Sequence, residues 1–150
     1  DVHDEGAAMF GGVAGHAGLF SNVYDLSLLY QMLLNKGTFN GVRYLRPETI
    51  QLFTSYNSKI SRRGLGFDKP EKDNLLRKDP YPSLLSSPAT FGHTGFTGTC
   101  VWVDPQYDLV YIFLSNRAFP TRDNNKLSQL LIRGKIQDAI YKALGADTHK

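Results

Sequence analysis

The sequence has a single cysteine, Cys100, among its 150 residues, so no disulfide can form within the chain. Cys100 lies in an apolar run, and we expect it to be a buried packing thiol and not a nucleophile. No apolar run approaches the roughly twenty residues that a membrane-spanning helix needs. We therefore expect no membrane span.

The sequence also lacks a concentrated charge of either sign. Its 17 basic and 14 acidic residues give a net charge of +3, and the basic residues gather only in small clusters near residues 59–63 and 77–78. A nucleic-acid-binding surface concentrates positive charge on one face. We therefore expect no nucleic-acid partner.

Metal-binding spacings are missing as well. His3, Asp4 and His16 could suggest a metal site, but no His-x-x-x-His pair or cysteine pair is present to fix its geometry. Loop histidines usually form local hydrogen bonds. We expect no metal and no other cofactor.

The composition is that of a globular protein with a core. Hydrophobic residues make up 41% and charged residues 21% of the chain, both ordinary values for a folded domain. No internal repeat or low-complexity tract is present. A chain of this size can bury roughly two-thirds of the surface that its unfolded form exposes.

The first half of the sequence predicts helices and a hairpin. Five glycines in residues 6–18 favour a loop. Ser21 is expected to cap a helix whose leucines recur at helical spacing up to Lys36-Gly37. Asn40-Gly41 predicts the turn of a short hairpin over 38–45, and Pro47 predicts the start of a helix over 48–53. We interpret residues 55–87 as an irregular surface excursion with a strand at 64–68.

The second half predicts two strands and a helix. Strands are expected at about 98–103 and 109–115, joined by a proline-containing turn into an antiparallel hairpin. Asp123 is the expected N-cap of one long final helix, whose apolar stripe would pack on the strands. The predicted fold class is therefore α+β. The stripe is formed by Leu127, Leu130, Leu131, Ile136, Ile140 and Leu144.

Residues 92–98, which read Gly-His-Thr-Gly-Phe-Thr-Gly, are the strongest candidate for a functional site. We place His93, Thr94 and Gly95 at the start of a strand, where glycine neighbours let a substrate approach the backbone. The imidazole and hydroxyl suit a carboxylate or carbonyl, and the N–H of Phe96 could face a developing oxyanion. The His-Thr-Gly triplet alone also fits a histidine with no catalytic role.

Two segments together give the sequence a family resemblance. Val2-His3-Asp4 followed by residues 11–26 resembles the Gly-Gly-x-x-Gly-x-x-Gly-Leu-x-Ser-x-x-x-Asp-Leu stretch of the β-lactamase-related serine hydrolases. This family includes class C β-lactamases, D-aminopeptidases and family VIII esterases. Its third active-site motif is Lys/His-Ser/Thr-Gly on an edge strand, and residues 92–98 are similar to the His version.

The resemblance implies roles for particular residues. His93 would be catalytic and, with Thr94 and Gly95, would contact the substrate. The Phe96 N–H would form half of an oxyanion hole that the nucleophile's own N–H completes. Asn116, followed by Arg117, resembles an Asn-Arg pair of some relatives and would also bind substrate, although a solvated strand end is an equal alternative. The implied fold is part of a β-lactamase and penicillin-binding-protein-like domain, located in the bacterial periplasm or cell envelope.

The sequence departs from this family at the nucleophile. The family's Ser-x-x-Lys, in which the lysine assists loss of the serine proton, occurs nowhere in the chain, and neither does Tyr-x-Asn. Both motifs normally precede the glycine-rich stretch. We therefore interpret residues 1–150 as the C-terminal part of one serine hydrolase domain, acting by acyl transfer on a β-lactam, ester or D-amino-acid amide, and we expect this part alone to be inactive.

The sequence also allows two other interpretations of the chain, and treating it as part of a domain has one structural consequence. The chain could be a non-catalytic module that binds peptidoglycan or a protein partner, or the tail of a protein whose preceding domain is a glycoside hydrolase. As an enzyme, the parent would act on a small molecule or a peptidoglycan-derived substrate. In this family, strands from the N-terminal end of the domain complete the central sheet. Without these strands a sheet edge and an apolar face would be exposed, so we expect copies of the chain to self-associate, for example as a swapped dimer.

Overall fold

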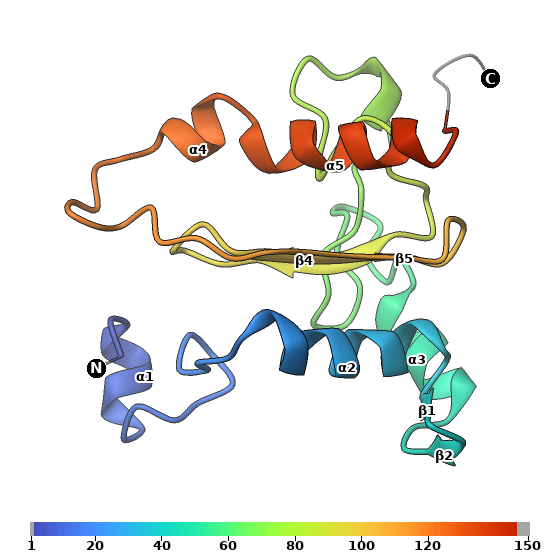
Figure 1. The fold of residues 1–150 in the computed structure, drawn as a ribbon, viewed down its shortest axis with the longest axis horizontal. Helices are drawn as coiled ribbons and strands as arrows, with labels where there is room; N and C mark the ends of the chain where they lie inside the picture. The colour runs from blue at the N-terminus through green and yellow to red at the C-terminus, as the bar shows by residue number, and fades with distance from the viewer. Residues whose placement is uncertain (1, 147–150) are drawn as a thin grey trace.

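The computed structural model describes residues 2–146, which form a layered arrangement of helices and an antiparallel sheet (Figure 1). The sheet consists of β3 (Phe91–Thr94), β4 (Cys100–Asp104) and β5 (Leu109–Phe113) in the order β3-β4-β5. Helix α2 (Val23–Leu34) covers one face of the sheet, and helix α5 (Ile132–Ala143) covers the other. The prediction of an α+β fold with the C-terminal helix on the strands is confirmed.

The central strand β4 is buried on both faces and divides the core in two. Because side chains alternate along a strand, Val103 faces the α2 side, where it packs with Met32 and Leu33. Trp102 faces the other side and clusters with Tyr111 and with Ile140 of α5. This explains why every residue of β4 is buried.

Cys100 lies in this second cluster and is buried, as predicted. Burial raises the pKa of its thiol to about 11, so the reactive thiolate form is disfavoured. Within residues 2–146, no helix is long and apolar enough to cross a membrane.

Local signals fixed three elements close to their predicted positions. Helix α2 begins one residue later than expected, because the side chain of Asn22 and not that of Ser21 accepts the Asp25 N–H at 3.0 Å. The hairpin of β1 (Thr38–Phe39) and β2 (Val42–Arg43) turns at Asn40-Gly41, both with positive φ, as the sequence predicts. Helix α3 (Pro47–Thr54) begins at Pro47.

Two predictions at the ends of the chain are wrong. Residues 6–18 were expected to be a loop throughout, but helix α1 (Glu5–Met9) occupies the first part of this stretch, where Asp4 caps the Ala7 N–H at 2.8 Å. The single final helix is two helices, α4 (Lys126–Gln129) and α5, separated by Leu131 in the left-handed region. Asp123 is not the N-cap, because α4 begins after Asn125.

The segment 55–87 was expected to be a surface excursion with a strand at 64–68, and both expectations need correction. It contains a short 3-10 helix, Asn74–Leu76, and meets the sheet through one bridge, Asp68 to Gly92. Several of its polar residues are buried, and buried polar groups need partners. Buried Asn74 has such partners: its side chain donates to the Ser83 carbonyl at 2.6 Å and accepts from the Tyr81 N–H at 2.7 Å.

Candidate active site

The sequence predicted the His-Thr-Gly triplet at the start of a strand. This prediction is wrong, because the triplet lies at the end of β3. His93 pairs with Val101, and Thr94 pairs with Cys100, as the last two residues of β3. As expected, β3 is an edge strand of the described sheet. Within residues 2–146, backbone pairing on its outer side is limited to Gly92, which exchanges hydrogen bonds of 2.7 and 3.0 Å with Asp68. The edge beside His93 is therefore left open by the backbone.

A tight turn follows the triplet. The Gly95 N–H donates to the Thr99 carbonyl at 2.8 Å, and the Gly98 N–H donates to the Gly95 carbonyl at 3.0 Å. Gly98 has φ +98°, and an added Cβ would lie 2.6 Å from Leu127 Cδ2, so glycine is required there. Phe96 occupies the first corner of this turn, and its N–H donates to no acceptor among residues 2–146. That N–H is available to a ligand.

Arg117 holds this turn against the end of β5. Its N–H donates to the Thr97 carbonyl at 2.8 Å, and its Nε donates to the Phe96 carbonyl at 2.8 Å. Its guanidinium carbon lies 4.4 Å from the centre of the Phe96 ring, a cation–π contact. The carbonyls of Arg122 and Asn124 accept from the same side chain. Arg117 therefore shapes the position of the Phe96 N–H.

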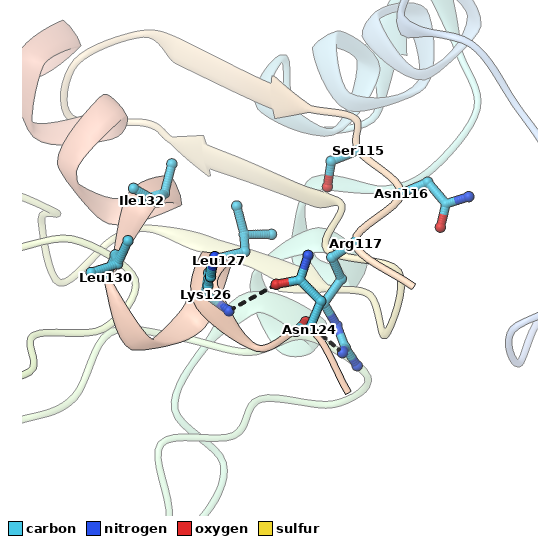
Figure 2. Close-up of a pocket in the computed structure, with 8 residues that line it drawn as sticks. All are labelled: Ser115, Asn116, Arg117, Asn124, Lys126, Leu127, Leu130 and Ile132. Carbon is cyan, nitrogen blue, oxygen red and sulfur yellow. Dashed lines mark hydrogen bonds between the residues drawn. The ribbon is translucent and has the colours of Figure 1, made fainter. Parts of the chain in front are cut away.

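Asn116 takes a different place from the triplet. It is exposed, and its side chain points away from Leu127 and Leu130 at the rim of a cavity of about 270 Å³ between the end of β5 and helix α4 (Figure 2). No hydrogen bond joins Asn116 to His93 in the described part of the chain. The other residues that line this cavity are Ser115, Arg117, Asn124, Lys126 and Ile132.

His93 has two polar neighbours. Its Nδ1 lies 2.7 Å from the carbonyl oxygen of Thr94, and its Nε2 lies 2.8 Å from Nη1 of Arg63. Arg63 was noticed in the sequence only as part of a small basic cluster. Thirty residues separate it from His93, so no local pattern could have identified this contact.

Arg63 in turn lies against a buried carboxylate. Its Nε is 3.2 Å from Oδ1 of Asp68, which is 2% exposed, and Arg62 Nε is 3.1 Å from the same oxygen. The Tyr81 hydroxyl donates to Oδ2 at 2.7 Å. Burial, more than the neighbouring Asp68, raises the pKa of Tyr81 to about 12, which keeps this phenol a donor. Two guanidinium groups thus offset the charge of Asp68, and a phenol donates a hydrogen bond to it.

The three residues considered for a metal site do not converge. The His3 ring stacks on Phe96 with centroids 5.9 Å apart and accepts a hydrogen bond from Arg122 Nε at 3.0 Å. His16 Nε2 lies 4.0 Å from Asp4 Oδ1. Among residues 2–146, no group of three or more His, Cys, Asp or Glu side chains is placed to hold a metal ion.

The sequence and its relatives identify the family of this site. The Beta-lactamase family model matches residues 1–133. The chain belongs to the β-lactamase family. An Escherichia coli K12 protein named "Putative D-alanyl-D-alanine carboxypeptidase" is 37% identical over 142 residues, which cover 93% of this chain and 32% of that protein. A protein of the same name from Salmonella enteritidis PT4 is 34% identical over the same coverage.

This β-lactamase-family chain spans about a third of the length of the curated relatives that it matches. A solved structure titled "Crystal structure of putative beta-lactamase from Bacteroides dorei DSM 17855" is similar to it with a TM-score of 0.47 and 14% identity. The similarity covers 87% of this chain and 48% of that one. The family resemblance read from the glycine-rich stretch and the His-Thr-Gly triplet is confirmed.

Proposed function

We propose that this β-lactamase-family chain forms one wall of the active site of a serine hydrolase that works by acyl transfer. The observation that carries the proposal is the free N–H of Phe96, at the corner of the turn that directly follows His93-Thr94-Gly95. An oxyanion hole needs backbone donors that are already oriented and not engaged elsewhere. The Phe96 N–H meets this need because hydrogen bonds of Gly95, Gly98 and Arg117 hold the turn.

In this proposal the residues of the wall have separate roles. Phe96 stabilises the oxyanion through its N–H, while His93, Thr94 and Gly95 contact the substrate along the open edge of β3. Asn116 would reach the substrate from the segment that follows β5, with an exposed side chain that forms no hydrogen bond to the triplet among the described residues. The serine nucleophile and its lysine would come from a segment of the same protein outside these 150 residues, since no Ser-x-x-Lys is present.

The names of the relatives support a proposal for the substrate class. The names of the Escherichia coli and Salmonella proteins point to D-alanyl-D-alanine peptides, and the family also includes enzymes that act on β-lactams and esters. We propose a peptidoglycan-derived or related small acyl substrate and a location in the cell envelope. The 150-residue chain is expected to be inactive by itself, because acyl transfer needs the nucleophile.

The first experiment tests inactivity directly. The purified chain is mixed with nitrocefin and with p-nitrophenyl acetate, and hydrolysis is compared with that of the His93→Ala variant. We expect no turnover above the buffer rate from either protein. Hydrolysis by the chain that His93→Ala abolishes would contradict the proposal that the nucleophile lies elsewhere.

The second experiment tests the oxyanion role in the longer gene product, provided that the reading frame before Val2 encodes Ser-x-x-Lys. Phe96→Pro removes the N–H at a turn corner where proline is favoured, whereas Phe96→Ala keeps the N–H and removes only the ring. We expect Phe96→Pro to lower kcat about 100-fold or more and Phe96→Ala to have a smaller effect. Equal effects of the two variants would refute the oxyanion role.

The missing Ser-x-x-Lys motif also favours a second function, a binding module without catalysis. If the upstream reading frame carries substitutions at the serine and lysine, this alternative replaces the enzyme. The chain would then bind peptidoglycan fragments without hydrolysing them, which calorimetry with a purified muropeptide measures.

A further inference from the structure

The contact between Arg63 and His93 fixes the chemical form of the imidazole. An arginine side chain has only N–H donors and stays protonated in proteins. At 2.8 Å from Arg63 Nη1, the Nε2 atom of His93 must therefore accept. The other ring nitrogen, Nδ1, lies 2.7 Å from the Thr94 carbonyl oxygen, which can only accept. These two contacts fit together only with a ring that carries one proton, on Nδ1.

The guanidinium that imposes this form is anchored through Asp68 to the strand bearing His93. Arg63 Nε lies 3.2 Å from the buried carboxylate of Asp68. The backbone of Asp68 pairs with Gly92, the residue before His93, through hydrogen bonds in both directions. Thus Arg63 cannot shift along the strand without breaking a contact with a buried charge, and breaking such a contact is costly.

We propose that Arg63 is a positioning residue that locks His93 in the neutral form with the proton on Nδ1. In this role Nε2 of His93 is occupied and does not serve as a general base. The fixed positive charge beside the triplet is then the guanidinium of Arg63, whose side chain is 52% exposed, and not the imidazole. Resting on the proposed function, we further infer that Arg63 provides the charge met by an anionic group of the substrate.

The protonation form is measured on the purified chain without any catalysis. Long-range ¹H–¹⁵N spectra of the ¹⁵N-labelled protein distinguish Nδ1–H from Nε2–H histidine, and His93→Gln identifies the His93 signals. We expect Nδ1–H in the wild type and a shift of the population toward Nε2–H in Arg63→Gln. Arg46→Gln is the matched control, because it removes the same charge from an exposed residue, and it should leave His93 unchanged.

Two results would overturn the positioning role. The first is Nε2–H in the wild type, a result that does not require any Arg63 variant to fold. The second is an unchanged His93 spectrum in Arg63→Gln when the backbone amide spectrum shows that the variant is folded. Arg63→Lys covers the case in which Arg63→Gln fails to fold: one ammonium cannot engage Asp68 and His93 as the guanidinium fork does, so we expect partial loss of the Nδ1–H form.

The charge role is measured by titration with N-acetyl-D-alanine, which has a carboxylate, and with N-acetyl-D-alaninamide, which does not. We expect the carboxylate probe to shift the signals of residues 93–96 and to bind about tenfold more weakly to Arg63→Gln, with Arg46→Gln like the wild type. Equal affinity in Arg63→Gln, or no binding of the carboxylate probe, would overturn it. These results are independent of hydrolysis, so the failure of this inference and that of the proposed function are distinguishable.

Discussion

The hydroxyl of Tyr141 donates to Oδ2 of Asp104 at 2.6 Å and thereby joins helix α5 to the end of β4. Asp104 is buried and also accepts from the hydroxyls of Ser87 and Thr90, at 2.6 and 2.8 Å, and from the N–H of Gln106 at 3.0 Å. Burial, followed by the nearby Asp104, raises the pKa of Tyr141, so the phenol remains a donor. One carboxylate thus holds three segments together.

Removing the Tyr141 hydroxyl should weaken this junction. We expect Tyr141→Phe to lower the free energy of unfolding by about 1–3 kcal/mol, because a buried hydrogen bond to a charged group is lost. Tyr107→Phe is the control: the Tyr107 ring packs edge-on against Tyr141 at 5.0 Å, but its hydroxyl donates no hydrogen bond within the described residues. Urea denaturation measures both, and equal losses would show that the hydroxyl of Tyr141 is not important.

Cys100 should be protected from thiol reagents. It is buried in the cluster of Trp102 and Tyr111, and burial raises its pKa to about 11. At pH 8 we expect the folded chain to react with DTNB at least about 100-fold more slowly than the chain in urea, because the thiolate is the nucleophile. Fast labelling of the folded chain would show that this face of the sheet opens readily.

Lys69 should make stability rise with pH in the alkaline range. It is 2% exposed, donates to the Thr90 carbonyl at 2.9 Å, and lies 4.7 Å from the Tyr56 ring centre. Burial lowers its pKa from 10.5 to about 8, although the charge of Asp104 acts in the opposite direction. Between these two values the unfolded chain binds a proton that the folded chain has lost, so the contribution of Lys69 to stability increases with pH.

The comparison with Lys69→Met isolates this contribution. The unfolding free energy of the wild type minus that of Lys69→Met should increase from about pH 8 to pH 10.5 and be flat below pH 7. Lys72→Met is the matched control, because Lys72 lies near the same Tyr56 ring at 5.8 Å but is exposed. A difference that does not change with pH for Lys69→Met would show that Lys69 titrates normally.

Gly98 should be the least replaceable residue of the turn beside the candidate site. Its φ is +98°, and a Cβ would lie 2.6 Å from both Leu127 Cδ2 and Ser115 Oγ. We expect Gly98→Ala to lower the unfolding free energy by about 1–3 kcal/mol through backbone strain and crowding together. Gly41→Ala shares a positive φ but has open space around it, so thermal denaturation should show a smaller loss there.

Self-association of the chain remains a prediction. Five large apolar side chains of α1 and the following segment are highly exposed: Met9 (88%), Phe10 (81%), Val13 (89%), Leu19 (73%) and Phe20 (74%). Exposed apolar surface of this extent favours association with another molecule. Sedimentation velocity at increasing concentration should reveal dimers, which Phe10→Ser with Val13→Ser should weaken. A clean monomer at high concentration would contradict this.

The sequence by itself determined the elements whose signals are local. The leucine spacing of α2, Asn40-Gly41 and Pro47 each act within a few residues of chain, so their patterns predicted structure correctly. The glycine-rich stretch and the His-Thr-Gly triplet likewise identified the family, because they are contiguous motifs.

Only the tertiary structure decided how distant residues combine. The stripe from Leu127 to Leu144 predicts one helix, but Leu131 adopts φ 52° and the chain divides there into α4 and α5. Residues 55–87 have no periodicity, yet they carry Asp68 to β3 and Arg63 to His93. Such contacts depend on packing between segments far apart in sequence, and no local pattern records them.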